Sequence, residues 1–254
     1  MKSFKPQGFT LLELLVVVGI LGILSAALLP AISNAVLRSN MAEVGMKGRD
    51  IYIAVAGANS QRKLLGLDSV WPRTETSSGG GSGSTDISNR AFYNSSDYFY
   101  ELYDGKNIGT SNWRPYVVGF DYSKLSGAGV SAKADLVDHL SAENNMWTIA
   151  ANVRDEMADI IPVLVTRNVD CRSLYKDLPD GSVGDELAWS YTYRTPFSNK
   201  GFVMIRKGGA VFRAHEKYAT VRVVYQNQSF MTTDWGSSLP PLIYLAPDSA
   251  EYPK

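Results

Sequence analysis

One carboxylate, Glu13, lies inside an apolar segment that runs from residue 9 to residue 32. This segment reads FTLLELLVVVGILGILSAALLPAI and contains no other charged residue. A carboxylate in such surroundings is costly unless something compensates its charge, and a residue kept at that cost usually has a function. Glu13 is therefore the first candidate for a functional side chain.

A second group with possible chemistry is the acidic segment 177–186, which reads DLPDGSVGDE. Oxygen ligands clustered in a loop suit calcium, and Asp177, Asp180 and Asp185 would be the ligands. The spacing does not follow the EF-hand pattern, however, and Pro-Asp-Gly is a common turn sequence. We therefore expect a solvated turn and no cofactor, with calcium binding as the less favoured alternative.

The counts of reactive residues narrow the classes of function. The 254 residues include one cysteine, Cys171, and two histidines, so no intrachain disulfide can form and most zinc sites and nucleophilic triads are disfavoured. The 25 basic residues equal the 25 acidic ones, which gives no electrostatic attraction to nucleic acid. The stretch 74–85, TETSSGGGSGST, lacks the lysine of a phosphate-binding loop and is typical of a flexible linker. We predict that the chain is not an enzyme and has no nucleic-acid partner.

The apolar segment itself must be positioned by a helix. A helix over 24 residues is roughly 36 Å long, which is enough to cross a hydrocarbon core of about 30 Å. A cleaved secretory signal would explain the basic start at Lys2 and Lys5 and the small residues 25–27, but not the length or the carboxylate. A plain signal anchor would leave Glu13 without a purpose.

The residues around Gly8 provide a third interpretation. The sequence QGFTLLEL, residues 7–14, resembles the prepilin processing site of type IV pilins and type II secretion pseudopilins. In that family a short basic leader ends in glycine, a membrane peptidase cuts after the glycine, the new N-terminal phenylalanine is methylated, and a glutamate four residues later is kept. The resemblance implies a leader over residues 1–8, a cut between Gly8 and Phe9, methylation of Phe9 and an assembly role for Glu13.

The resemblance also implies how Glu13 would act and what its partners would be. Cleavage creates an α-amine on Phe9, one helical turn from Glu13, and pairing the two charges offsets much of the cost of burying either alone. In the family this pair forms between neighbouring subunits and sets their register. The implied partners are other copies of the chain, other pilin-like subunits, the prepilin peptidase and methyltransferase, an inner-membrane assembly platform and membrane lipid.

The elements expected after the apolar segment are one amphipathic helix and a small sheet. The helix would continue over residues 33–67. Its glycines at 45, 48 and 57 would each weaken it by roughly 1 kcal/mol relative to alanine. A further helix is expected at 95–103, and partly helical segments at 132–139 and 142–157. Strands are expected at 161–166, 189–194, 202–206, 210–213 and 218–226, with a glycine turn at 207–209.

These expectations combine into one prediction of fold and function. The fold class is α+β: a long N-terminal helix, with a membrane half and an amphipathic half, packed on a small antiparallel sheet as in pilins. The predicted parts are the leader 1–8, the transmembrane and assembly helix 9–32, and a globular part 33–254 in the periplasm. The chain would be a single-pass inner-membrane protein that polymerises into a type IV pilus-like filament or a type II secretion pseudopilus.

A different class of function stays open beside this one. The chain could be a membrane-anchored periplasmic enzyme or carbohydrate-binding module, because the acidic turn and the aromatic-rich stretch 92–113 can serve in such sites. Without basic residues around them, the aromatic side chains more often pack in a core or a subunit interface.

The single cysteine also excludes the disulfide that closes a C-terminal loop in many type IV pilins, which favours a pseudopilin or a divergent pilin.

Overall fold

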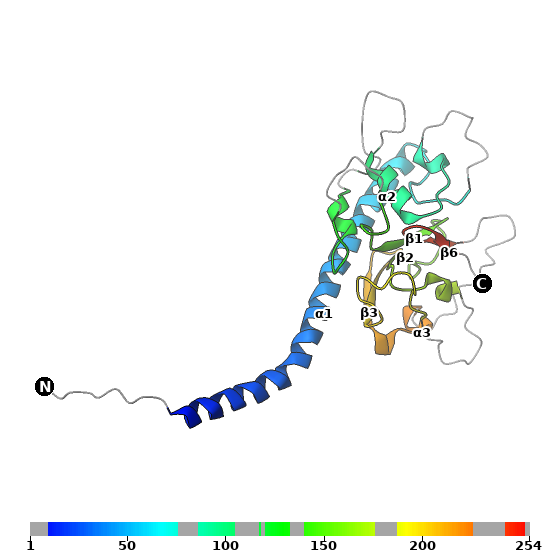
Figure 1. Cartoon of the computed structure of the whole chain (residues 1–254). Helices are drawn as coiled ribbons and strands as arrows, with labels where there is room; N and C mark the ends of the chain where they lie inside the picture. Colours follow the sequence, from blue (N-terminus) through cyan, green and yellow to red (C-terminus); the bar gives the residue numbers. More distant parts are fainter. Residues whose placement is uncertain are drawn as a thin grey trace. The chain divides into compact units, whose positions relative to one another are not determined.

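The computed structural model describes residues 10–75, 86–104, 117, 120–132, 140–175, 187–225 and 242–251. The chain divides into two compact units, Met1–Asn40 and Met41–Lys254. One helix, α1 (Leu11–Leu64), runs through both (Figure 1). The leader, the cut site at Gly8 and Phe9, and most of the expected linker lie outside the described residues, as do the calcium candidates Asp177, Asp180 and Asp185.

In the first unit, α1 exposes its whole apolar surface. Every residue from Thr10 to Val36 is exposed, including Leu11 at 83% and Ile23 at 73%. The helix continues through Pro30, although proline removes one backbone donor. A side chain added at Gly19 or Gly22 would meet nothing within 4 Å in this chain.

In the second unit, one side of α1 is buried. Its buried residues recur every three or four positions, which is the period of a single helix face; they are Met41, Val44, Gly45, Gly48, Ile51 and Val55. The helix ends slightly earlier than expected, in a Schellman motif around Gly66 at φ +68°. There Leu67 N–H donates to the Arg62 carbonyl at 3.0 Å and Gly66 N–H to the Lys63 carbonyl at 3.2 Å.

The buried side of α1 covers a six-stranded antiparallel sheet with the order β4-β3-β2-β1-β5-β6 (Figure 1). The strands are β1 (Trp147–Ala151), β2 (Pro162–Thr166), β3 (Gly201–Arg206), β4 (Val211–His215), β5 (Ile243–Leu245) and β6 (Ala250–Glu251). The hairpin between β3 and β4 turns through Gly209 at φ +77°, as its glycines predict. The α+β architecture predicted from the sequence, a long helix packed on a small antiparallel sheet, is confirmed.

The two faces of the sheet bury different clusters, so its central strands have no polar side. Side chains of Val203 and Ile205 approach the glycines of α1, while Phe202 and Met204 belong to a cluster on the other face. Two short elements contribute to that second cluster, η4 (Cys171–Tyr175) and α3 (Val221–Val224). A third, η5 (Glu216–Tyr218), has no buried residue, but Ala219 directly after it belongs to the cluster. A sheet buried on both faces explains why β1, β2 and β3 are continuously apolar instead of alternating.

Three of the secondary-structure predictions are wrong. Residues 189–194 form turns rather than a strand, because the Ser190 hydroxyl accepts the Tyr193 N–H at 3.1 Å and fixes a turn. Where it is described, the stretch 218–226 contains the end of η5 and all of α3, since the Thr220 side chain caps α3 by accepting from Val223 N–H. The segment 142–157, expected to be partly helical, contains β1, whose Trp147, Thr148 and Ile149 favour a buried strand.

In the described part of the aromatic-rich stretch, Phe92, Tyr98 and Phe99 pack in the core, whereas Tyr93 is 62% exposed. Helix α2 (Ser95–Asp104) confirms the helix expected at 95–103. Tyr98 and Phe99 are fully buried, and the Phe99 ring stacks on Phe120 with centroids 5.8 Å apart. Two further short elements, η1 (Ile87–Asn89) and η3 (Tyr122–Leu125), complete this end of the molecule.

Candidate functional site

The carboxylate of Glu13 is held by a reciprocal cap at the start of α1. Thr10 donates to Glu13 Oε2 twice, from its backbone N–H at 2.9 Å and from its hydroxyl at 2.8 Å. Glu13 N–H in turn donates to Thr10 Oγ1 at 3.3 Å. This is a capping box, with Thr10 as the N-cap and Glu13 three residues later. The pattern Thr-x-x-Glu was present in the sequence, and our sequence reasoning missed it.

The capping box fixes where the negative charge lies. Both donors bind Oε2, and the carboxylate sits beside the first turn of α1, where unpaired backbone N–H groups favour a negative charge. The side chain can therefore serve its own helix and still accept a further donor. Phe9 lies outside the described residues, so its pairing with Glu13 stays a prediction.

The helix that carries Glu13 is the one described helix that is long and apolar enough to cross a membrane. None of its most apolar 18-residue window is buried within the chain. Gly19 and Gly22 face open space, and small residues such as these allow helices to approach closely. The apolar surface of this unit is thus available to lipid or to other helices.

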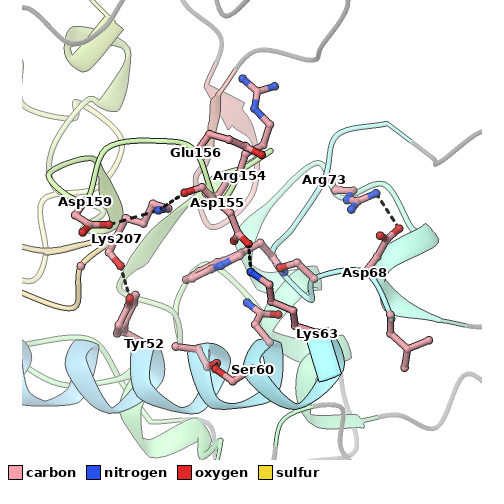
Figure 2. A pocket seen from close by; sticks show the side chains of 17 residues that line it. Tyr52, Ser60, Lys63, Asp68, Arg73, Arg154, Asp155, Glu156, Asp159 and Lys207 are labelled. Atoms are coloured by element: carbon pink, nitrogen blue, oxygen red, sulfur yellow. Dashed lines mark hydrogen bonds and ion pairs between the residues drawn. The ribbon is translucent and has the colours of Figure 1, made fainter. Parts of the chain in front are cut away.

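The second feature is a hollow of about 700 Å³ in the globular unit (Figure 2). Its walls come from the last turns of α1, the segment 67–73, the β1–β2 connection and the β3–β4 turn. Lys63 Nζ reaches from α1 to Asp155 Oδ2 at 2.9 Å, and Lys207 Nζ binds the Asp155 carbonyl at 2.9 Å and Asp159 Oδ1 at 3.4 Å. Charged side chains of both signs therefore line this hollow in linked pairs.

Tyr52 lies at one end of the same hollow, where its hydroxyl donates to the Lys207 carbonyl. Partial burial raises the pKa of Tyr52, and the negative charge of Asp159 raises it further. The hydroxyl is therefore a lasting donor at neutral pH. It joins α1 to the β3–β4 turn and holds that wall in place.

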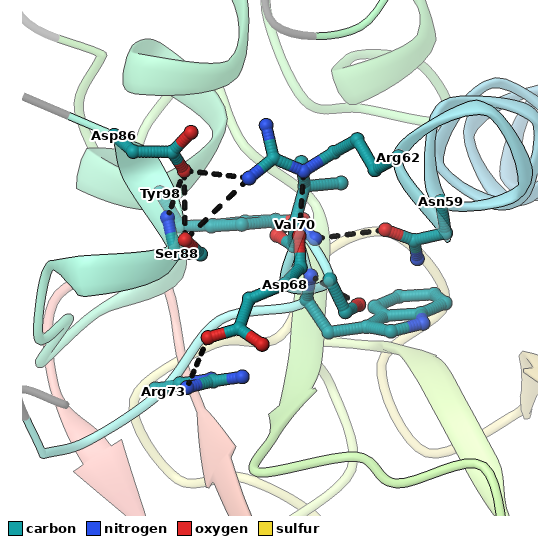
Figure 3. Close-up of polar contacts among 10 residues, drawn as sticks. Asn59, Arg62, Asp68, Val70, Arg73, Asp86, Ser88 and Tyr98 are labelled. Carbon is teal, nitrogen blue, oxygen red and sulfur yellow. Dashed lines mark hydrogen bonds and ion pairs between the residues drawn. The ribbon is translucent and has the colours of Figure 1, made fainter. Parts of the chain in front are cut away.

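A polar network beside the hollow anchors the end of α1 (Figure 3). Arg62 Nε donates to the Asp68 carbonyl at 2.6 Å and its Nη2 pairs with Asp86 Oδ1 at 2.7 Å. Asn59 Oδ1 accepts the Val70 N–H at 2.8 Å, and the Val70 carbonyl accepts the hydroxyl of buried Tyr98 at 3.0 Å. These contacts position the segment that forms one wall of the hollow.

Asp86 is expected to make the fold sensitive to acid. Burial alone would raise its pKa, but hydrogen bonds from the backbone and hydroxyl of Ser88 and from Arg62 outweigh burial, so the pKa is lowered. A carboxylate with a lowered folded pKa stabilises the fold above the unfolded value of about 3.9, and that contribution is lost as the pH falls through the folded value. Asp86→Asn should lower the free energy of unfolding by about 1–2 kcal/mol at pH 7 and lose less than wild type in acid.

Urea unfolding of the full chain in detergent, followed by tryptophan fluorescence from neutral to acidic pH, measures both effects. Glu156→Gln removes one exposed negative charge of the same globular unit and should match wild type throughout. Equal acid sensitivity of Asp86→Asn and wild type would contradict the assignment.

Of the cysteine and the two histidines, Cys171 and His215 lie within the described residues, and His139 lies outside them. Cys171 is fully buried, and its Sγ lies 3.9 Å from the Val169 carbonyl. His215 ends β4. Within the part of the chain that the structure describes, no three histidine, cysteine, aspartate or glutamate side chains gather as a metal site.

Comparison with known proteins found a match for the N-terminal segment that contains Glu13. Residues 4–29 match the family model described as the prokaryotic N-terminal methylation motif, the prepilin-type signal of type IV pilins and pseudopilins. The matched range includes Gly8, Phe9, Thr10 and Glu13. No curated protein and no solved structure matches the chain.

Proposed function

We propose that this chain, which carries the prokaryotic N-terminal methylation motif over residues 4–29, is a structural subunit of a type IV pilus-like filament or type II secretion pseudopilus. The observation that carries the proposal is that the matched motif extends into a helix whose apolar surface is exposed. A helix with no buried residue over its most apolar window needs lipid or other helices around it. When the subunit leaves the lipid and enters a filament, the same helices of neighbouring subunits surround it instead.

The processing and assembly roles follow from the motif. In this proposal the prepilin peptidase cuts between Gly8 and Phe9, the amine of Phe9 is methylated, and Glu13 of one subunit pairs with the Phe9 amine of another. The leader 1–8 stays in the cytoplasm, the helix 9–32 crosses the inner membrane once, and residues 33–254 lie in the periplasm. An assembly platform, other pilin-like subunits and membrane lipid are the proposed partners.

The cysteine content favours a pseudopilin or a divergent pilin over the pilins that carry a disulfide. The one cysteine, Cys171, lies fully buried in the second core cluster. It packs there as a small apolar side chain. The disulfide that closes a C-terminal loop in many type IV pilins cannot form within this chain, because it needs two cysteines.

The proposed processing predicts a defined N-terminus on protein isolated from its native host. We expect intact-mass and N-terminal peptide mass spectrometry to find a chain beginning with N-methyl-Phe9. Removing the leader takes away Lys2 and Lys5, so 25 − 2 = 23 basic residues would face 25 acidic ones and the mature chain would carry a charge of −2.

Two variants make the test of processing specific. Gly8→Ala should slow the cut, because a side chain then has to enter the peptidase site, and Phe9 should stay unmethylated. Gly19→Ala, in open space further along the helix, should be processed normally. A native chain that keeps Met1 or begins near Ala27 would overturn the proposal.

A further inference from the structure

The hollow in the globular unit has no part in the proposed assembly. Its lining contains equal numbers of basic and acidic side chains. Its wall carries four basic residues, Lys63, Arg73, Arg154 and Lys207. It also carries four acidic ones, Asp68, Asp155, Glu156 and Asp159. Three cation–carboxylate pairs link them, at 2.9, 3.4 and 3.5 Å between nitrogen and oxygen. The hollow thus offers many hydrogen-bond donors and acceptors but no net charge.

The pairs differ in how firmly they are held. Lys63 and Asp155 are 79% and 81% exposed, and such a pair adds little stability, so both side chains can turn toward a ligand. Lys207 is only 16% exposed and is fixed between the Asp155 carbonyl and Asp159. One end of the hollow is therefore rigid, while the other can adapt.

Two aromatic rings supply the apolar part of the lining. Trp71 and Tyr52 are half-buried, pack against the second core cluster, and lie with ring centroids 6.2 Å apart at 38°. The backbone N–H of Trp71 donates to the Ser69 hydroxyl at 3.1 Å, and the backbone N–H of Val70 donates to Asn59 Oδ1. The backbone that carries the indole is therefore anchored on both residues. A preformed aromatic surface among paired charges is the main physical character of the site.

We propose that this hollow binds a neutral oligosaccharide. A sugar ring has an apolar C–H face that can lie on an indole or phenol ring, and hydroxyls that both donate and accept. Paired carboxylates and ammonium groups can bind such hydroxyls on both sides without losing each other. The volume of about 700 Å³ lies within the usual range of ligand sites, roughly 300–1,000 Å³.

Charge argues against the other ligand classes. A polyanion or a polycation gains nothing from a surface on which four positive and four negative side chains balance. A charged peptide would have to displace existing partners and leave them unpaired, which is costly at the shielded Lys207. The inference is independent of filament formation, because the lining belongs wholly to the globular unit.

The test uses the full chain in a detergent without a sugar headgroup, such as lauryldimethylamine oxide. Cellohexaose, chitohexaose and maltohexaose are the neutral probes, and an alternating Lys-Glu hexapeptide is the charged probe. Binding is measured by saturation-transfer NMR at low and high salt. We expect at least one neutral hexasaccharide to bind with little dependence on salt.

Two matched variants place the binding in the hollow. Ser60 is an exposed residue of α1 that lines it, so Ser60→Phe fills the space and removes the hydrogen bond that the Ser60 hydroxyl donates to the Ala56 carbonyl within the helix. It should weaken binding at least about tenfold, or 1.4 kcal/mol. Gln61→Phe puts the same side chain on the next exposed position, outside the lining, and should bind as wild type does.

Each other outcome overturns the inference. If none of the three hexasaccharides binds, or if binding survives Ser60→Phe, the hollow is not a saccharide site. If the charged hexapeptide binds there instead, and salt weakens it, the paired side chains serve a charged ligand.

Discussion

Replacing Glu13 by glutamine is expected to lower incorporation of the chain into filaments at least about tenfold, while membrane insertion and cleavage continue. Glutamine can replace glutamate in a capping box, so the start of α1 should remain as it is. What it removes is the negative charge. A Phe9 amine surrounded by apolar helices then has no counter-charge, and the loss of that pair should prevent stable assembly.

The capping box makes it possible to separate two roles of Glu13. Thr10→Ala removes the hydroxyl that binds Glu13 Oε2 and keeps the charge. Thr10→Ser keeps both and serves as the control. If the charge is what assembly needs, Thr10→Ala should assemble nearly normally and Glu13→Gln should fail; filaments are counted by electron microscopy and cleavage is followed by immunoblot.

The opposite ranking would change the assignment. If Glu13→Gln assembled normally and Thr10→Ala did not, Glu13 would act by shaping the first turn of α1. Its pairing with a neighbouring amine would then be wrong.

The second large effect is expected at Gly48, where the helix meets the sheet. A Cβ built there would lie 2.5 Å from Trp147 Cη2 and 2.9 Å from Ile205 Cγ1. Trp147 cannot give way easily, since it is fully buried and its indole N–H donates to the Lys124 carbonyl at 3.0 Å. Gly48→Ala should therefore lower the free energy of unfolding by about 1–3 kcal/mol despite alanine's better helix propensity.

Gly57 provides the matched control on the same helix. It is exposed and a Cβ there would meet nothing within 4 Å, so Gly57→Ala should raise the free energy of unfolding by roughly 0.5–1 kcal/mol. Chemical denaturation of both variants and wild type decides the question. If both changes stabilised the chain, the close approach at Gly48 would be disproved.

These two glycines also show how far the sequence could be read. The 3.6-residue period of apolar positions predicted the amphipathic helix, and the apolar runs around positions 163 and 204 predicted β2 and β3. From the sequence, Gly48 and Gly57 have the same predicted effect, which is to weaken the helix relative to alanine. Only the sheet against Gly48 distinguishes them, and the residues that contact it, Trp147 and Ile205, lie 99 and 157 positions further along the chain.

The errors at 189–194 and 218–226 have the same cause. Alternating apolar and polar residues favour a strand, but the side chains of Ser190 and Thr220 bind nearby backbone N–H groups and fix turns instead. The N-terminal motif was read correctly because its residues are contiguous. The hollow was not foreseen, since its lining is drawn from four segments between positions 52 and 208.

The pairing of α1 with the sheet has a consequence for synthesis of the chain. The surface that Gly45 and Gly48 share with Val203 and Ile205 joins residues that leave the ribosome far apart in time. Between Gly48 and Ile205, 157 residues must be added, which takes roughly 8–30 s at about 5–20 residues per second. During that interval the stripe of Met41, Val44, Ile51 and Val55 lacks β3 and β4, and for most of it β1 and β2 as well. In a chain anchored by its first helix, this apolar stripe would stay exposed beside the membrane until the last third is synthesised. A chaperone or the lipid surface could cover it during that time.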